Sequence, residues 1–293
     1  MGINKKAKMT DKIMTVIFYI GAIFILTLLS AFVIYILIKG FTGFKWSLLK
    51  FNAAGIGNQL FNTIYLVVLS LIISVPLGVA AGIYMAEYSK EGRIKNFLRI
   101  CIETLSSLPS IVVGLFGYLV FIIMTGSKWN LMAGALSVSI LCLPLIATVT
   151  EDAFRSLPVK YKEGSYGIGA THWQTIIHVL LPACLLRIIT GIILAAGRGF
   201  GEAAALLYTA GMSTAINWNN WNPLAPNSPL NPFRPGETLA LHIWAMRSEA
   251  VVPNAAQLAN FSSAILIILV FVFSLSARWF SHRMDQKLKG SLK

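Results

Sequence analysis

Arg198 and Glu202 are opposite charges four residues apart, in a glycine-rich segment of an otherwise apolar stretch. Residues at this spacing lie on one face of a helix and can pair. An arginine suits an oxyanion, because its planar guanidinium offers parallel N–H donors to two oxygens. A charge at the centre of a bilayer costs at least ~2.5–3.5 kcal/mol on insertion scales, so it needs a partner or a water-filled path. The pair is therefore predicted to line the path of an anion, with Glu202 holding Arg198 when no anion is near. The alternative is a buried ion pair that only fixes helix packing.

Glycines four residues apart occur beside this pair and again earlier in the chain. Gly197 and Gly201 flank Arg198, and Gly78 and Gly82 lie in a second apolar stretch. Small residues at this spacing let two membrane helices approach closely. Both pairs are predicted to form such packing faces.

The stretch that carries Arg198 is one of six long apolar stretches. Of the 293 residues, 56% are hydrophobic and 12% charged, whereas a soluble domain has about 25% charged residues. A membrane-spanning helix needs about 20 mostly apolar residues. The sequence therefore predicts an all-α integral membrane protein with six transmembrane helices, at residues 13–38, 60–86, 104–126, 129–149, 183–208 and 261–278.

Lys and Arg side chains concentrate on one side of the predicted membrane. They cluster before the first span, at 90–99, at 155–162 and from 278 onward, whereas few lie in the alternate connections. Because cytoplasmic loops carry the excess of Lys and Arg, both termini are predicted to be cytoplasmic. The same asymmetry accounts for most of the net charge of +13 without a nucleic-acid partner. The first apolar stretch exceeds the roughly 7–15 residues of a signal-peptide core, so we expect it to remain as a span.

Two connections between the predicted spans are long. One, at residues 150–182, is predicted on the cytoplasmic side. The other, at 210–257, is predicted outside and contains a helix at 237–246 that is expected to lie on the membrane surface. The chain thus divides into a cytoplasmic N-terminus, first span and external loop in 1–57, a five-helix domain in 58–279 and a basic cytoplasmic tail in 280–293.

The cytoplasmic connection carries a spaced motif. Glu163 is followed by Gly169, which permits a sharp turn between two short helical pieces, and then by Pro182, which can stop one helix or start the next. This pattern resembles the EAA loop of ABC importer permeases, with Gly164 and Ser165 where that family usually has two alanines. The resemblance implies that this connection, termed the coupling loop, fits a groove on an ATPase subunit. The residues to which it assigns this contact are Glu163, Gly164, Ser165, Gly169, Ala170, Trp173, Gln174 and Pro182.

No motif for ATP hydrolysis accompanies the coupling loop. The sequence contains no G-x-x-x-x-G-K-[ST] phosphate-binding loop and no nucleophile–base arrangement. The three cysteines have no metal-site spacing, and the four histidines fall outside the predicted spans or at their ends. We therefore expect a transporter subunit and not an enzyme, with no cofactor on this chain and with ATP–Mg bound by a partner ATPase.

A longer resemblance, covering nearly the whole chain, is to the A-type permease subunits of phosphate ABC importers. The motifs that carry it follow one another at 62–63, 76–78, 103–105, 108–112, 114–117, 201–204, 206–211 and 222–235. It implies the type I ABC importer permease fold for 58–279 and half of a phosphate channel, with Arg198 and Glu202 at the charged channel positions. The partners that it implies are two ATPase copies, a second homologous permease chain of the C type, an external phosphate-binding protein, inorganic phosphate and the lipid of a prokaryotic plasma membrane.

Three alternatives remain at this point. A permease of the same architecture for molybdate or sulfate would also use an arginine. A secondary transporter driven by an ion gradient often shows internal repeats, which this sequence lacks, and it would leave the coupling loop unexplained. A membrane metalloenzyme would need His, Asp and Glu side chains clustered at one depth.

Overall fold

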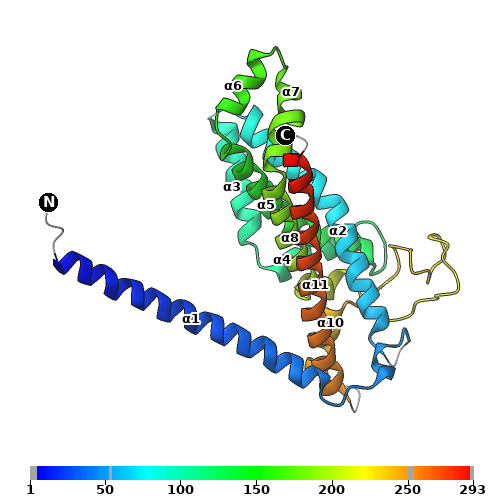
Figure 1. The fold of residues 1–293 in the computed structure, drawn as a ribbon. Helices are drawn as coiled ribbons and strands as arrows, with labels where there is room; N and C mark the ends of the chain where they lie inside the picture. Colours follow the sequence, from blue (N-terminus) through cyan, green and yellow to red (C-terminus); the bar gives the residue numbers. More distant parts are fainter. Residues whose placement is uncertain (1–4, 53–54, 91, 250–253, 291–293) are drawn as a thin grey trace.

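The computed structural model describes residues 5–52, 55–90, 92–249 and 254–290, and these ranges form helices joined by loops (Figure 1). Within them, five helices are long and apolar enough to cross a membrane, at Ala7–Phe41, Gly57–Tyr88, Leu131–Arg155, His172–Gly201 and Ala255–Arg283. The predicted all-α class is confirmed. The helices are α1 (Lys5–Phe41), α2 (Gly57–Ile83), α3 (Arg93–Ser107), α4 (Ser110–Tyr118), α5 (Leu131–Arg155), α6 (Lys160–Gly167), α7 (His172–Thr175), α8 (Leu181–Gly201), α9 (Ala204–Thr209), α10 (Leu239–Ser248) and α11 (Ala255–Gly290).

The third predicted span, 104–126, is a bent pair of helices and not one straight helix. α3 and α4 meet at an angle of 98°. The bend lies at Leu108, which is extended with φ −65° and ψ 132°, because the ring of Pro109 disfavours the helical conformation of the residue before it. The described residues therefore form up to six spans, with this pair counted as one.

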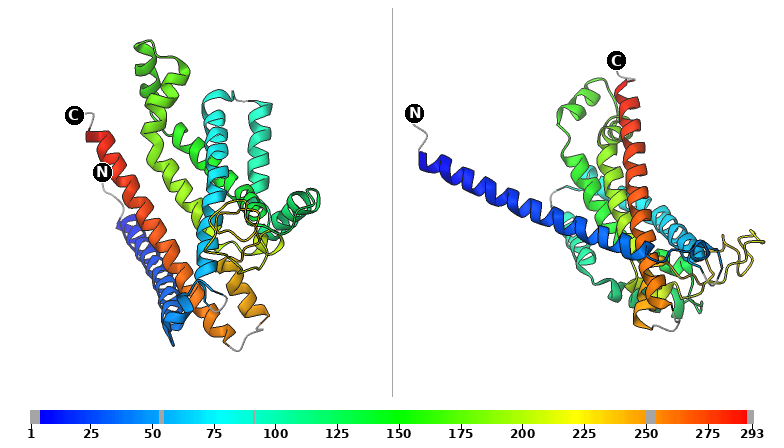
Figure 2. Two further views of the ribbon diagram at one scale, coloured as in Figure 1. Left: turned by 90° about the vertical axis from the view of Figure 1, so that its right-hand side faces the viewer. Right: turned by 60° about the horizontal axis from the view of Figure 1, so that its bottom comes forward.

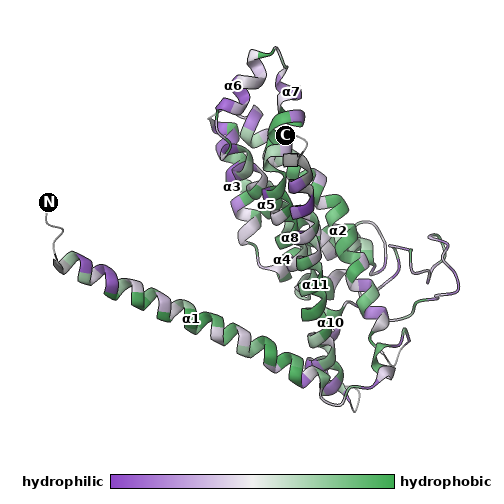
Figure 3. Cartoon of the chain, in the orientation of Figure 1, coloured by the Kyte–Doolittle hydropathy of each residue, from purple (hydrophilic) through white to green (hydrophobic). Residues whose placement is uncertain are grey.

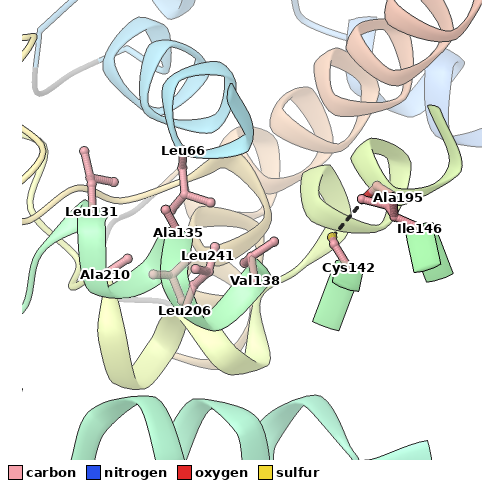
Figure 4. Packing of buried hydrophobic residues seen from close by; sticks show 10 residues of the cluster. All are labelled: Leu66, Leu131, Ala135, Val138, Cys142, Ile146, Ala195, Leu206, Ala210 and Leu241. Carbon is pink, nitrogen blue, oxygen red and sulfur yellow. Dashed lines mark hydrogen bonds between the residues drawn. The ribbon is translucent and has the colours of Figure 1, made fainter. Parts of the chain in front are cut away.

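α2 and α5 form the centre of the bundle, and glycines bring them together. A Cβ atom at Gly78 would lie 2.8 Å from the side chain of Ile146, and one at Gly82 would lie 2.6 Å from the carbonyl oxygen of Ala147. The packing face predicted for these glycines is confirmed. The apolar cluster that surrounds them joins five helices (Figure 4) and consists of Leu66, Leu131, Ala135, Val138, Cys142, Ile146, Ala195, Leu206, Ala210 and Leu241.

α1 runs away from the other helices at an angle (Figures 1 and 2). It packs on α11 through its end, where the rings of Phe41 and Phe261 meet edge-on at 6.0 Å. None of the residues in its most apolar window is buried within this chain, and Figure 3 shows hydrophobic residues along most of its length. A helix that is apolar on all sides requires lipid or another protein around it.

In the described part of the chain, three π-helical turns interrupt the α-helical hydrogen-bonding pattern. They are Tyr84–Tyr88 at the end of α2, Leu119–Ile123 after α4, and Ile176–Leu180 between α7 and α8. In the first of them, the N–H of Ser89 donates to the carbonyl of Tyr84 at 2.9 Å, one residue further back than in an α-helix. Such turns are frequent at functional sites.

The connection predicted at 210–257 lies at the end of the bundle opposite α6 and α7 (Figure 1). Its predicted helix is confirmed as α10, and its position on the membrane surface stays a prediction. Leu239, Leu241 and Ala245 are buried, and α10 packs against α11 and α2. Residues 250–253 of this connection, 1–4 of the N-terminus and 291–293 of the predicted basic tail lie outside the described residues.

Candidate functional site

Arg198 lies in the last turn of α8, on a face that this chain leaves open. Leu194, Gly197 and Gly201 share that face through their helical spacing. The side chain of Leu194 is 54% exposed, and a Cβ atom at Gly197 or Gly201 would meet no atom within 4 Å. The packing face predicted for these two glycines therefore has no partner helix among the described residues. The two glycines leave unfilled space on the face that carries Arg198.

The opposite face of α8 is packed into the bundle. A Cβ atom at Gly199 would lie 3.5 Å from Val67 of α2 and 3.4 Å from Val138 of α5. The ring of Phe200 packs against that of Phe273 in α11, with 5.2 Å between centroids. Because three helices fix the rotation of α8, Arg198 is held on the open side.

Glu202 does not continue the helix that carries Arg198. It is extended, with φ −75° and ψ 122°, and its Oε1 accepts a hydrogen bond from the N–H of Ala205 at 3.1 Å. The buried carboxylate thereby satisfies an N–H at the start of α9, which has no partner within that helix. The predicted span at 183–208 breaks here, so the helical turn assumed for the Arg198–Glu202 pair is wrong. Among the described residues, no ion pair joins the two side chains.

The guanidinium of Arg198 is half-buried and has no hydrogen bond or ion pair with a described residue. Its position at the carboxyl end of α8 favours a cation, because the helix dipole is negative there. Arg187 lies on the same face three turns earlier, ~16 Å away along the helix axis, and donates to the hydroxyl of Ser156. A cavity of about 310 Å³ beside Arg187 is lined also by Asp152 and Thr190. The two guanidinium groups thus lie in line along α8, while Gly191 between them packs on Val149 of α5.

The coupling loop forms two short helices joined by a sharp turn, as predicted. Gly169 has φ +83°, a conformation that favours glycine, and it separates α6 from α7. α7 begins with a capping box, in which Thr171 and Gln174 satisfy each other's backbone N–H groups. Pro182 directly follows the π-helical turn Ile176–Leu180 inside the continuous helical run His172–Gly201, so it neither stops one helix nor starts the next.

The tip of the coupling loop protrudes from the bundle and is bare (Figure 1). Ile168 is 87% exposed and Trp173 is 59% exposed, and a Cβ atom at Gly164 would meet nothing within 4 Å. Glu163 is exposed and Ala170 half-buried, whereas Ser165 is buried and hydrogen-bonded to the hydroxyl of Thr175 at 2.9 Å. Large exposed apolar side chains beside small ones suit insertion into the groove of another protein.

Three ion pairs, made by two carboxylates at the base of the coupling loop, were not predicted. Nζ of Lys162 lies 2.8 Å from the carboxylate of Glu87, and Glu151 pairs with Arg155 at 2.8 Å and with Arg99 at 3.3 Å. Both carboxylates are buried. The sequence signal was a carboxylate at the end of each of two apolar spans, which needs a cation from elsewhere in the fold.

A buried polar cluster anchors the opposite end of the molecule and was also not predicted. Arg234 is 1% exposed, and it donates to Asn62 Oδ1 at 2.7 Å and to the carbonyl of Ser228 at 2.9 Å. Burial lowers the pKa of Arg234 to about 10, so it stays charged at neutral pH. Glu237 pairs with Nδ1 of His242 at 3.0 Å. The signal was that Arg234 and Glu237 are the charged residues of an otherwise uncharged segment, 210–246.

Comparison with known proteins assigns this arrangement to a family. The family model described as "Binding-protein-dependent transport system inner membrane component" matches residues 78–290. The chain belongs to that family.

Among the described residues, no group of three or more His, Cys, Asp or Glu side chains could hold a metal ion.

Relatives and solved structures agree with a binding-protein-dependent permease. The chain is 46% identical to "Probable ABC transporter permease protein YqgI" of Bacillus subtilis, covering 97% of this chain and 99% of that one. It is 30% identical to "Phosphate transport system permease protein PstA 2" of Mycobacterium tuberculosis, covering 82% and 78%. The fold is that of type I ABC importer permeases. A bacterial ABC transporter involved in alginate import superimposes with a TM-score of 0.64 over 95% of this chain and 98% of that one at 15% identity. The methionine transporter MetNI gives 0.57 over 82% and 96% at 18% identity.

Proposed function

We propose that this binding-protein-dependent permease is a subunit of an ATP-driven phosphate importer and forms half of its translocation path. The observation that carries the proposal is the half-buried guanidinium of Arg198, which lies without a described partner on the bare face of an apolar helix. An isolated charge in that position is costly unless it meets an anion or water. The relatives named phosphate transport system permease proteins support phosphate as that anion.

The residues of the open face provide hydrogen-bond donors for an oxyanion and space beside those donors. Arg198 offers parallel donors to two phosphate oxygens, and Gly197 and Gly201 leave room for the ion beside it. Glu202 shapes the break between α8 and α9 through the hydrogen bond that its carboxylate accepts from the N–H of Ala205. A second, homologous permease chain of the C type faces this side of α8 and completes the path.

The coupling loop connects this path to ATP hydrolysis on a separate chain. Its exposed tip at Ile168 and Trp173 fits a groove on an ATPase subunit, which binds ATP–Mg, and this chain itself carries no cofactor. An external phosphate-binding protein delivers the substrate at the opposite end. Lys and Arg gather before α1, at 90–99, at 155–162 and from 278 onward, which supports a cytoplasmic position for the end that holds α6 and for both termini in a prokaryotic plasma membrane.

The test is radiolabelled phosphate uptake. The chain is co-expressed with its genomic neighbours, and the purified complex is placed in proteoliposomes with ATP inside and the binding protein outside. ATP-dependent uptake that molybdate and sulfate do not inhibit is the expected result. ATP-dependent movement of another anion would overturn the assignment of phosphate, and uptake driven by an ion gradient without an ATPase would overturn the coupling role.

A further inference from the structure

Glu87 is a buried carboxylate at the end of α2 that adjoins the coupling loop. It lies in the π-helical turn Tyr84–Tyr88, and its side chain is 3% exposed. A buried carboxylate that stays ionised needs a cation, because the protein interior does not replace its hydration. That cation is Lys162 of α6, whose Nζ lies 2.8 Å from Oε2 of Glu87.

The same turn of α2 also contacts α7. The ring of Tyr88 meets the ring of His172 edge-on, with 4.9 Å between centroids. His172 in turn hydrogen-bonds through Nδ1 to the hydroxyl of Tyr166 in α6, at 2.8 Å. Because the two short helices are tied to each other and each contacts this turn, the coupling loop holds the end of α2 at two points.

Away from these contacts, α6 is separated from the bundle by open space. A cavity of about 330 Å³ lies between α6 and the ends of α2 and α5, and both Glu87 and Lys162 line it. Its wall also includes Phe154 and Val159. A cavity passes no contact force, so a displacement of α6 reaches α2 through the ion pair that borders the cavity and through the contacts of Tyr166 with His172 and of His172 with Tyr88.

α2 leads from this turn to the helix that carries Arg198. Its glycines at 78 and 82 pack closely on α5, and further along it Val67 packs in one cluster with Ala196 and Phe200 of α8. These two residues precede and follow Arg198 within a single turn. The end of α2 gripped by the coupling loop and the turn that carries Arg198 are therefore linked by continuous packing.

We propose that the Lys162–Glu87 ion pair transmits movement of the coupling loop to α2, and so sets how much transport accompanies each ATP hydrolysed. The inference rests on the proposed function, because it assumes that the coupling loop binds an ATPase. Lys162 and Glu87 are positioning residues and do not touch the substrate. The Lys162–Glu87 pair joins α6 to the end of α2 beside the cavity, whereas the neighbouring Arg99–Glu151 pair joins α3 to α5 and involves neither α6 nor α7.

The test measures phosphate transported per ATP hydrolysed, using the assembled complex in proteoliposomes with its binding protein. Lys162→Met and Glu87→Gln each remove one charge at nearly constant volume. We expect both variants to capture the ATPase and hydrolyse ATP, while the transport ratio falls by about 2- to 30-fold, the range for residues within a coupling network. Lys162→Arg keeps the charge and is expected to keep the ratio. The exchange of charges, Glu87→Lys with Lys162→Glu, is expected to recover part of it, which a double-mutant cycle quantifies.

Two controls separate transmission from general damage. Lys160→Met removes an exposed charge from α6, and Arg99→Met breaks the Arg99–Glu151 ion pair. Both are expected to leave the phosphate transported per ATP unchanged. A merely structural role for Lys162 would lower ATP hydrolysis and transport together and leave their ratio at the wild-type value, which would overturn the proposal. If the wild-type complex carries an anion other than phosphate, the same ratio measured with that anion still tests the ion pair, so the substrate assignment can fail separately.

Discussion

Adding one methyl group at Gly82 is expected to destabilise the bundle, because α2 and α5 are closest there. The new Cβ would lie 2.6 Å from the carbonyl oxygen of Ala147 and 2.9 Å from Cγ2 of Thr150. Overpacking of this kind costs ~1–3 kcal/mol, while replacing a glycine inside a helix by alanine returns ~0.5–1 kcal/mol. Gly82→Ala should therefore lose up to roughly 2.5 kcal/mol, which corresponds to a thermal midpoint up to about 10 °C lower for a chain of this size.

The assay is thermal unfolding of the isolated chain in detergent, followed by circular dichroism and by the exposure of buried cysteine to a thiol probe. Gly197→Ala is the matched control, because it makes the same change inside a helix where a Cβ atom meets nothing within 4 Å. Its midpoint should stay at the wild-type value or rise slightly. A midpoint for Gly82→Ala equal to that of Gly197→Ala would refute the reasoning, since it would mean that α2 can move away from α5 without loss.

Three further predictions concern the path, the coupling loop and the external end. Arg198→Ala should assemble normally and lose phosphate uptake, because no other described side chain takes the place of its guanidinium; uptake at the wild-type rate, with exposed Arg278→Ala as the control, would contradict this. Gly169→Ala should weaken ATPase capture in pull-down titrations by roughly 5- to 30-fold, since a non-glycine residue at positive φ costs ~1–2 kcal/mol. Gly167→Ala, which has no neighbour within 4 Å and no positive φ, should have no such effect. Arg234→Met should raise hydrogen exchange throughout the loop before α10, because hydrogen bonds to a charged group contribute ~1.5–3 kcal/mol; unchanged protection would show that the loop is held by other contacts.

The spans could be predicted from the sequence, but the breaks within them could not. Apolar length alone located five continuous helices. Prolines gave contradictory signals, because Pro76 and Pro144 lie inside intact helices, whereas Pro109 follows a 98° bend. The difference is set by what surrounds each proline: neighbouring helices can compensate for a missing hydrogen bond in the membrane. A single sequence does not contain that information.

The coupling loop was the part of the site that the sequence predicted best, because its geometry is local. A glycine at positive φ and a capping box both act within a few residues, so Gly169, Thr171 and Gln174 could be interpreted without a fold. The predicted pairing of Arg198 with Glu202 was wrong because it assumed that the helix continues beyond Gly201. The Lys162–Glu87 pair could not be found, since it joins residues from two distant parts of the chain.

The π-helical turn Ile176–Leu180 joins α7 directly to α8, so the number of residues in this turn sets the rotation of α7 relative to α8 about the helix axis. The turn holds one residue more than an α-helix needs, which rotates α7 by ~100°. Removing one residue from Ile176–Leu180 would leave α8 in place but turn α7, and Trp173 with it, toward a different side of the molecule. A one-residue gap at such a turn, in any alignment of this permease family, is therefore a change in the direction of the coupling loop and not a change in helix length.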